Sequence, residues 1–358
     1  MPDTRVQRKP PGVRKVKEMD PLWRRRSRLA VRQSMLRAEE MWRLKSAFVE
    51  HDRSRPGAEA DGPAVPRSIT TTSTAPRLAR VRTSRPYTLD AGRWVNLTGG
   101  VQFSAPAEHY DRFMGRYAPK LAVALADAAG VSAGMRVLDV GCGPGGLTHE
   151  LVGRAGADHV AAIDPSPQFA AANRARHPGA DVREGAAEDL PFADDAFDAA
   201  LSSLVIGFMR DADAGAREMA RVTRPGGVVA ECMWDIPGGG MTMLSTFWRA
   251  VRTVEPSAEG EQARVGVRDG EIAELLRGAG LSEVESGTLA TSAKYADFDD
   301  FWEPFTFAVG PAGSYLRQQD ADRQQAIRDH CFALLGEPSG PFELEARAWY
   351  ARGTVPAG

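Results

Sequence analysis

The chain has 358 residues, enough for one α/β domain with additional elements, and its net charge of −2 conceals a strong asymmetry. The first 100 residues contain 22 of the 45 lysines and arginines and 10 of the 47 acidic residues, so they carry +12 and the remainder −14. The chain has three cysteines at wide spacings, scattered histidines and no apolar run of 18 residues, a composition that excludes a disulfide framework, a zinc-finger pattern and an ordinary membrane-spanning helix. Since the N-terminus also lacks the apolar core of a secretory signal, we expect a cytoplasmic protein with no metal site and no membrane association.

Residues 1–102 are predicted to form a basic, largely disordered extension. One helix is predicted at about 20–50, because Asp20 and Pro21 suit the N-cap and first helical positions. This arginine-rich helix could bind nucleic acid, a membrane surface or a partner, or it could be a solvated appendage. We favour the appendage, since no nucleic-acid motif accompanies the charge. Residues 52–100 are rich in Pro, Ser, Thr, Gly and Arg and are interpreted as a linker.

The globular domain is predicted to span residues 103–358, and it begins with a helix, a break and a second helix over 107–130. Short apolar runs then alternate with helical stretches, which is typical of a parallel sheet covered on both faces. The last strand alternates in polarity and is expected to pair antiparallel near the sheet edge. Strands are predicted at 136–140, 159–163, 181–184, 197–203, 227–233, 282–290 and 342–352, and helices at 146–155, 166–176, 212–223 and 268–279.

Two stretches, 235–267 and 296–338, are longer than the sheet requires, and the second contains a helical segment at 319–335. Insertions of this size at strand ends usually cover or shape a pocket. Their aromatic residues are more often core than pocket, but they are also the best candidates for the wall of a substrate site. These aromatic residues, with the one that precedes the first insertion, are Trp234, Phe247, Trp248, Phe301, Trp302 and Phe305.

The sequence VLDVGCGPGG, residues 137–146, predicts a buried strand, a glycine turn and the start of a helix, which together bring backbone N–H groups close to a ligand. Its glycines satisfy the pattern G-x-G-x-x-G, a weak signal by itself. Asp164 ends the next strand, where a carboxylate can accept both hydroxyls of a ribose, but NAD and S-adenosylmethionine share that feature. Asp139 favours S-adenosylmethionine over NAD. Its carboxylate would face the pyrophosphate of a dinucleotide, whereas it suits a cationic methionine moiety.

Further motifs occur in a fixed order around this turn, and with them the chain resembles the class I S-adenosylmethionine-dependent methyltransferases. It is most similar to the subgroup that includes the ubiquinone and menaquinone-biosynthesis methyltransferases and many small-molecule methyltransferases. The resemblance covers residues 105–290 and implies a Rossmann-like three-layer sandwich whose mostly parallel seven-stranded sheet has an antiparallel edge strand. The insertions would then form a helical lid. The additional motifs are YDRFMGRYAPKLA (110–122), AAIDPSPQFAAAN (161–173), AAEDLPFADDAFDAALSS (186–203) and RVTRPGGVVA (221–230).

The resemblance also implies a set of cofactor contacts for S-adenosylmethionine. The turn would approach the methionine portion, a strand-end carboxylate would bind the ribose, and the loop near residue 188 would line the adenine. Relatives often carry Asp where this chain has Ala186 and His where it has Gly207 and Phe208, so an adenine contact and His-based catalysis are in doubt. The implied residues are Tyr110 and Arg116 for the methionine carboxylate, Asp139 for its ammonium, Gly141, Cys142, Gly143 and Gly145 in the turn, Asp164 for the ribose, Ala187, Glu188 and Asp189 for the adenine, and Ser202 beside the methyl group.

The expected reaction is in-line displacement of the methyl group by an O-, N- or C-nucleophile of a small-molecule acceptor. The sequence identifies no catalytic residue; Glu231, Asp235, Glu303 and His109 are candidate bases. SSLV (202–205) stands where nucleic-acid amino-methyltransferases carry [DNS]-P-P-[YF], which favours a small molecule. The alternatives are an NAD(P)-binding oxidoreductase, disfavoured by Asp139 and by the lack of a Tyr-x-x-x-Lys pair, and a non-catalytic nucleotide-binding protein with a nucleic-acid-binding N-terminus. Nothing in the sequence specifies the acceptor or the oligomeric state.

Overall fold

The computed structural model describes residues 87–90, 93–96, 106–261 and 264–357. The helix predicted at about 20–50 lies outside these residues. Part of the predicted linker is described, and it forms an antiparallel hairpin of β1 (Tyr87–Asp90) and β2 (Arg93–Asn96). The interpretation of 52–100 as irregular did not include this hairpin.

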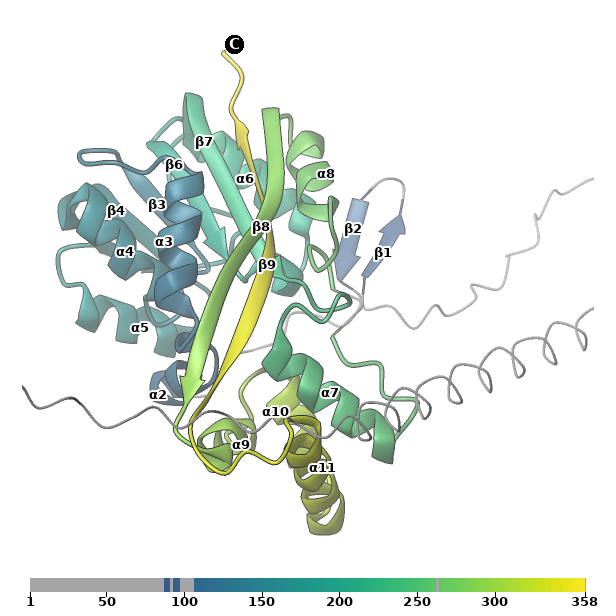
Figure 1. The fold of residues 1–358 in the computed structure, drawn as a ribbon. Helices are drawn as coiled ribbons and strands as arrows, with labels where there is room; N and C mark the ends of the chain where they lie inside the picture. Colours follow the sequence, from purple (N-terminus) through teal and green to yellow (C-terminus); the bar gives the residue numbers. More distant parts are fainter. Residues whose placement is uncertain (1–86, 91–92, 97–105, 262–263, 358) are drawn as a thin grey trace, which may run out of the picture. The chain divides into compact units, whose positions relative to one another are not determined.

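A seven-stranded sheet forms the centre of the domain (Figure 1). All neighbouring strands pair in parallel except β9, which is antiparallel to β7 and to β8. The predicted, mostly parallel sheet is therefore confirmed, and its one reversed strand is second from the edge. Across the sheet the order is β5 (Asp181–Glu184), β4 (Val160–Asp164), β3 (Val137–Val140), β6 (Phe197–Ser203), β7 (Thr223–Trp234), β9 (Phe342–Thr354) and β8 (Ser282–Tyr295).

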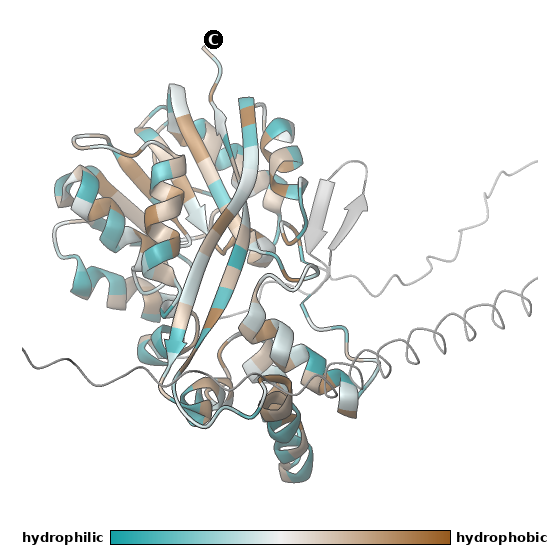
Figure 2. Cartoon of the chain, viewed as in Figure 1, coloured by the Kyte–Doolittle hydropathy of each residue, from teal (hydrophilic) through white to brown (hydrophobic). Residues whose placement is uncertain are grey.

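Strand composition follows position in the sheet. All residues of β3 and β4 are buried, because helices cover both faces of central parallel strands. The C-terminal half of β8 instead alternates between exposed and buried residues. It continues to Tyr295 because it pairs with β9 along that length. Figure 2 shows the same contrast, with apolar colour on the central strands and polar colour on the outward sides of the helices.

Helices cover both faces of the sheet, with α3, α4 and α5 on one face and α6 and α8 on the other (Figure 1). The break predicted within 107–130 is confirmed, since the leading segment divides before α3. The helices and single turns are α2 (Ala107–Tyr110), the π-helical turn η1 (Asp111–Gly115), α3 (Ala118–Ala128), α4 (Gly146–Ala155), the 3₁₀ turn η2 (Ala157–His159), α5 (Pro167–Arg176), the 3₁₀ turn η3 (Ile206–Phe208), α6 (Ala212–Val222) and α8 (Glu271–Gly278).

The two insertions contribute further helices, which gather at the end of the sheet shown at the bottom of Figure 1. They are α7 (Thr242–Val254) from the first insertion and α9 (Phe298–Thr306), α10 (Gly310–Arg317) and α11 (Ala321–Leu334) from the second. A stacked pair, Phe247 with Phe305, joins the insertions, with ring centroids 4.5 Å apart. Among the described residues, no helix combines the length and the apolar character needed to cross a bilayer.

Candidate active site

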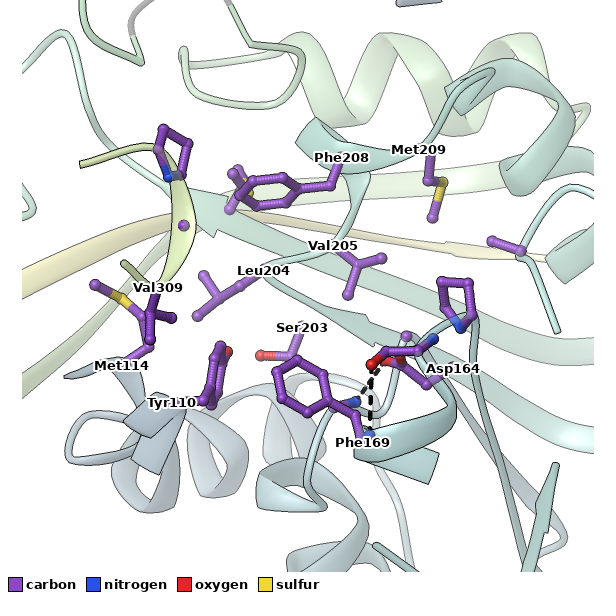
Figure 3. A pocket seen from close by; sticks show the side chains of 18 of the residues that line it. Tyr110, Met114, Asp164, Phe169, Ser203, Leu204, Val205, Phe208, Met209 and Val309 are labelled. Carbon is purple, nitrogen blue, oxygen red and sulfur yellow. Dashed lines mark hydrogen bonds between the residues drawn. The ribbon is translucent and has the colours of Figure 1, made fainter. Parts of the chain in front are cut away.

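A cavity of about 530 Å³ lies at the carboxyl ends of the parallel strands, the edge at which open α/β sheets bind ligands (Figure 3). Loops that follow β3, β4, β5, β6 and β7 contribute to its lining, as do η1, α7 and the α9–α10 junction. The glycine turn and the inserted segments therefore meet at one cavity.

Gly141 and Gly143 give the turn its shape. The N–H of Gly141 donates to the carbonyl oxygen of Ile163 over 2.8 Å, and its φ is +73°, a region that side chains disfavour. A Cβ on Gly141 would lie 2.4 Å from a methyl carbon of Val205, so only glycine fits. Gly143 lines the cavity as Gly141 does, but it differs because a Cβ on Gly143 would meet no atom within 4 Å. The turn is tight against the protein at Gly141 and open towards the cavity at Gly143.

Asp164 ends β4 and is held by backbone amides (Figure 3). Its Oδ2 accepts a hydrogen bond from the N–H of Gly143 and its Oδ1 one from the N–H of Ser166, each over 2.8 Å. Burial raises the pKa of this carboxyl, while the two amides oppose the shift. A carboxylate has about four acceptor positions, so the lone pairs left over can bind ligand hydroxyls in the cavity that Asp164 lines.

Asp139 lies beneath the turn and is 1% exposed, outside the cavity lining. Its Oδ2 accepts a hydrogen bond from the hydroxyl of Thr148 over 2.6 Å, and that hydroxyl accepts one from Asn173 over 2.8 Å. Burial raises the pKa of Asp139 to about 7, Thr148 opposes the shift, and the charge of Asp164 adds to it. Two carboxylates that are costly to ionise therefore flank the turn, an electrostatic setting that favours a cationic ligand over a pyrophosphate.

The segment after β5 supplies the side of the cavity next to Asp164. Ala187 and Glu188 both line it, as the resemblance implied. The Oε1 of Glu188 accepts hydrogen bonds from the N–H groups of Arg210 and Asp211, over 2.6 and 3.2 Å. Asp189 is exposed and is not among the lining residues.

Of the other predicted cofactor contacts, some line the cavity and some do not. Tyr110 lines the cavity, whereas Arg116 forms an ion pair with Asp300 at 3.0 Å and does not line it. Ser202 is buried, and its hydroxyl has no hydrogen-bond partner within the described part of the chain. Because side chains alternate along β6, the next residue, Ser203, lines the cavity in its place.

Cys142 and Gly145 belong to the turn without lining the cavity. The N–H of Cys142 donates to Ile163 over 2.9 Å, which ties the turn to β4. A Cβ on Gly145 would lie 2.7 Å from the side-chain oxygen of Asn173 and 2.8 Å from the ring of His177. The role that the structure shows for these two residues is packing of the turn against β4 and α5.

The predicted bases and the predicted aromatic wall both lie largely elsewhere. Among the described residues that line the cavity, none is Glu231, Asp235, Glu303 or His109. Of the aromatic residues proposed for the wall, Trp234 lines the cavity, and the others pack in the core. Sequence reasoning missed most of the apolar lining, although two of its members stand in the quoted motif YDRFMGRYAPKLA. The missed residues include Phe113, Met114, Phe169, Leu204, Val205, Phe208, Met209, Met233, Ile236, Leu244 and Val309, together with Glu261.

The profile of a family described as "Methyltransferase domain" matches residues 138–230. A malonyl-[acyl-carrier protein] O-methyltransferase of Erwinia billingiae is 38% identical over 123 residues, covering 34% of this chain and 47% of the relative. A demethylmenaquinone methyltransferase of Mycolicibacterium paratuberculosis is 33% identical over 169 residues, covering 44% of this chain and 72% of the relative. The chain belongs to the class I S-adenosylmethionine-dependent methyltransferases.

This methyltransferase-family chain spans about half the length of the first curated relatives that it matches. Among solved structures, it is similar to Phospholethanolamine N-methyltransferase 2 of Haemonchus contortus, with a TM-score of 0.43 and 18% identity over 70% of this chain and 57% of the other. The cofactor of the family, S-adenosylmethionine, fits the residues present. Open space lies beside Gly143, free acceptor positions remain on Asp164, and two buried carboxylates suit the cofactor's positive charge.

Proposed function

We propose that the protein transfers a methyl group from S-adenosylmethionine to a small-molecule acceptor. The carboxylate of Asp164 carries the proposal, because it lies at the end of β4, is oriented by the N–H of Gly143, and lines a cavity that continues between the inserted segments. Family membership supports the choice of cofactor, and the two named relatives, a malonyl-[acyl-carrier protein] and a demethylmenaquinone methyltransferase, support an acceptor other than nucleic acid.

The proposal assigns a role in cofactor binding to each of the following residues. Asp164 accepts the ribose hydroxyls, the segment of Ala187 and Glu188 contacts the adenine, and Gly143 allows the backbone to approach the methionine portion. Asp139 balances positive charge from below the turn. When bound, S-adenosylmethionine supplies a methyl group that the sulfonium already activates, so the protein's task is to align the partners and exclude water. Direct contact of any of these residues with the cofactor stays a prediction. The predicted contact residues that do not line the cavity are Arg116, Asp139, Cys142, Gly145, Asp189 and Ser202.

Calorimetry on the full chain tests the proposal. We expect S-adenosylhomocysteine to bind with one-to-one stoichiometry and to raise the unfolding temperature, since a ligand that binds the native state stabilises it. We expect NADH to do neither. Tight binding of NADH without a response to S-adenosylhomocysteine would contradict the proposal. Incubation with metabolite extracts and cofactor labelled in the methyl group then identifies the acceptor.

A further inference from the structure

We infer that the methyl acceptor is an apolar molecule with a neutral hydroxyl group, and that the carboxylate of Glu261 binds this hydroxyl. The inference rests on the proposed function, which makes the second ligand of the cavity a methyl acceptor. It adds the chemical class of that acceptor and the residue that recognises it.

The acceptor end of the cavity, defined here by Trp234, Ile236, Leu244, Glu261 and Val309, is predominantly apolar. Its residues belong to the end of β7 and to the two inserted segments, the first of which contains α7. Asp164 and the glycine turn form the donor end. In Figure 3, Val309 lies on the opposite side of the cavity from Asp164. A ligand that fills the acceptor end therefore buries mainly apolar surface, which favours an apolar framework at roughly 25 cal/mol per Å².

Glu261 is the charged side chain at the acceptor end, as judged from the described residues. The other charged residues of the lining are Asp164, Glu188 and Arg210. Asp164 lies at the donor end, where it ends β4, and the Nε of Arg210 lies 4.0 Å from the carboxylate of Glu188. A ligand bound at the acceptor end can therefore form a hydrogen bond to one charged side chain, that of Glu261.

The carboxylate of Glu261 is fixed from behind and is 6% exposed. Its Oε1 accepts a hydrogen bond from the indole N–H of Trp248 over 3.2 Å, and Trp248 packs against Tyr315 with ring centroids 5.4 Å apart. Its Oε2 has no hydrogen-bond donor within the described residues. Because Glu261 lines the cavity, a ligand hydroxyl that reaches Oε2 gains a strong, charge-assisted hydrogen bond.

Arg264 determines that this ligand group is neutral. Its Nε lies 3.8 Å from Oε2 of Glu261, its guanidinium lies over the ring of Phe208 at 4.2 Å, and it donates to the carbonyl oxygen of Gly207 over 2.9 Å. Burial raises the pKa of the Glu261 carboxyl, while Arg264 and Trp248 oppose the shift. Because Arg264 already balances the negative charge, an ammonium group at Oε2 would meet a fixed positive charge, whereas a hydroxyl would not.

Three naphthalene probes test the inference with the full chain saturated with S-adenosylhomocysteine. The probes are 2-naphthol, 2-methoxynaphthalene, which lacks the hydroxyl proton, and 2-naphthylmethylamine, which is cationic at pH 7.5. Calorimetry measures their dissociation constants for wild type, for Glu261→Gln and Glu261→Leu, and for Glu259→Gln. Glu259 is a matched control, because it is exposed, belongs to the same segment and does not line the cavity.

We expect wild type and Glu259→Gln to bind 2-naphthol at least about tenfold more tightly than either other probe, as a hydrogen bond to a charged group predicts. Glu261→Leu should abolish this preference and Glu261→Gln should weaken it. Equal binding of 2-naphthol and 2-methoxynaphthalene to wild type, no binding of 2-naphthol, or a preference that survives in Glu261→Leu would each overturn the inference. If the amine bound most tightly, the inference that the acceptor carries a neutral hydroxyl would be wrong.

Binding of S-adenosylhomocysteine separates this inference from the proposed function. The substitutions lie at the acceptor end, so all variants should bind S-adenosylhomocysteine as wild type does, which also shows that they are folded. Loss of the naphthol preference with normal S-adenosylhomocysteine binding supports the role of Glu261. Failure of wild type itself to bind S-adenosylhomocysteine contradicts the proposed function, whatever the probes do.

Discussion

The donor end and the acceptor end of the cavity are built by different means. At the donor end, backbone groups fix the geometry, since the N–H groups of Gly141 and Cys142 both donate to Ile163 and that of Gly143 donates to Asp164. Each of these residues lies directly at or after the end of a central parallel strand. At the acceptor end, apolar side chains from segments inserted between strands form the wall, and the carboxylate of Glu261 is held by side chains alone.

This difference separates two tasks. Sheet pairing positions the donor end, so a small set of residues with special backbone or charge properties suffices there. The acceptor end depends on the sizes and shapes of many side chains, so its specificity can change without disturbing the sheet. Substitutions at the donor end should therefore affect folding or cofactor binding, and those at the acceptor end should affect neither strongly.

The largest effect is expected for Gly141→Ala. Its Cβ would overlap the side chain of Val205 at 2.4 Å and would force alanine to a φ of +73°. Overpacking and the left-handed conformation together should lower the free energy of unfolding by about 2–5 kcal/mol. Urea denaturation followed by circular dichroism measures this change.

Gly143→Ala is the matched comparison for this substitution. Its φ is +51°, but its Cβ meets no atom within 4 Å and extends beside the cavity. We expect it to lower stability by no more than about 1–2 kcal/mol and instead to weaken S-adenosylhomocysteine binding. Adding Val205→Ala should restore part of the stability lost in Gly141→Ala. If both glycine variants unfold alike, crowding by Val205 is not what requires glycine at position 141.

Asp164→Ala should weaken binding of S-adenosylhomocysteine by about 1–3 kcal/mol, the usual value of hydrogen bonds to a charged group. The substitution also leaves the N–H groups of Gly143 and Ser166 without their acceptor, so the turn loses an anchor. Titration calorimetry provides the measurement, with Asp158→Ala as an exposed control outside the cavity lining. An unchanged affinity would mean that the ribose binds elsewhere.

The affinity for S-adenosylhomocysteine should depend on pH through Asp139, whose pKa burial raises to about 7. In the free protein this carboxyl is protonated below that pH, whereas the ammonium group of the ligand favours its ionised form. Affinity should therefore increase as the pH rises from 5.5 to 7 and then level off, by at most about tenfold per pH unit. The raised pKa of Asp164 acts in the same direction.

Dissociation constants between pH 5.5 and 8 measure this dependence, and calorimetry in two buffers of different ionisation enthalpy counts the protons released. Asp139→Asn should flatten the profile, since the amide can still accept a hydrogen bond from Thr148 but cannot titrate. An affinity that falls as the pH rises through 7 would refute this account of Asp139.

The parts of the fold and cavity that follow from the sequence are those set by periodicity or by unusual residues. The central strands, the flanking helices and the glycine turn could be predicted, because continuous apolar runs, helical spacing and left-handed glycines each have one local explanation. The predicted strand at 282–290 was too short, since pairing with β9 extends β8 through Thr291–Tyr295, a stretch that includes polar residues. That pairing is not visible in either segment alone.

The acceptor end could not be predicted for a similar reason. Glu261 lies in the first insertion and Val309 in the second, and nothing in either segment shows that the two residues line the same cavity. Composition singled out the aromatic residues of the insertions, but most of them fill the core, as Phe305 does between Phe247 and Phe113. The alternation of side chains along β6 also mattered: Ser203 lines the cavity, whereas the preceding residue, Ser202, which was predicted to do so, does not.

The smallest effect on cofactor binding is expected for Val309→Ala, which tests whether the two ends are independent. Val309 is 1% exposed and lines the cavity on the side opposite Asp164 (Figure 3). Removing two methyl groups enlarges the acceptor end but changes no group at the donor end, so the affinity for S-adenosylhomocysteine should stay within about 0.5 kcal/mol of wild type. Binding of a bulky apolar probe such as 2-naphthol should change instead, since the wall that it contacts has moved away. If Val309→Ala altered cofactor affinity as strongly as Asp164→Ala, the lid and the glycine turn would be energetically coupled, and the division of the cavity into two ends would be wrong.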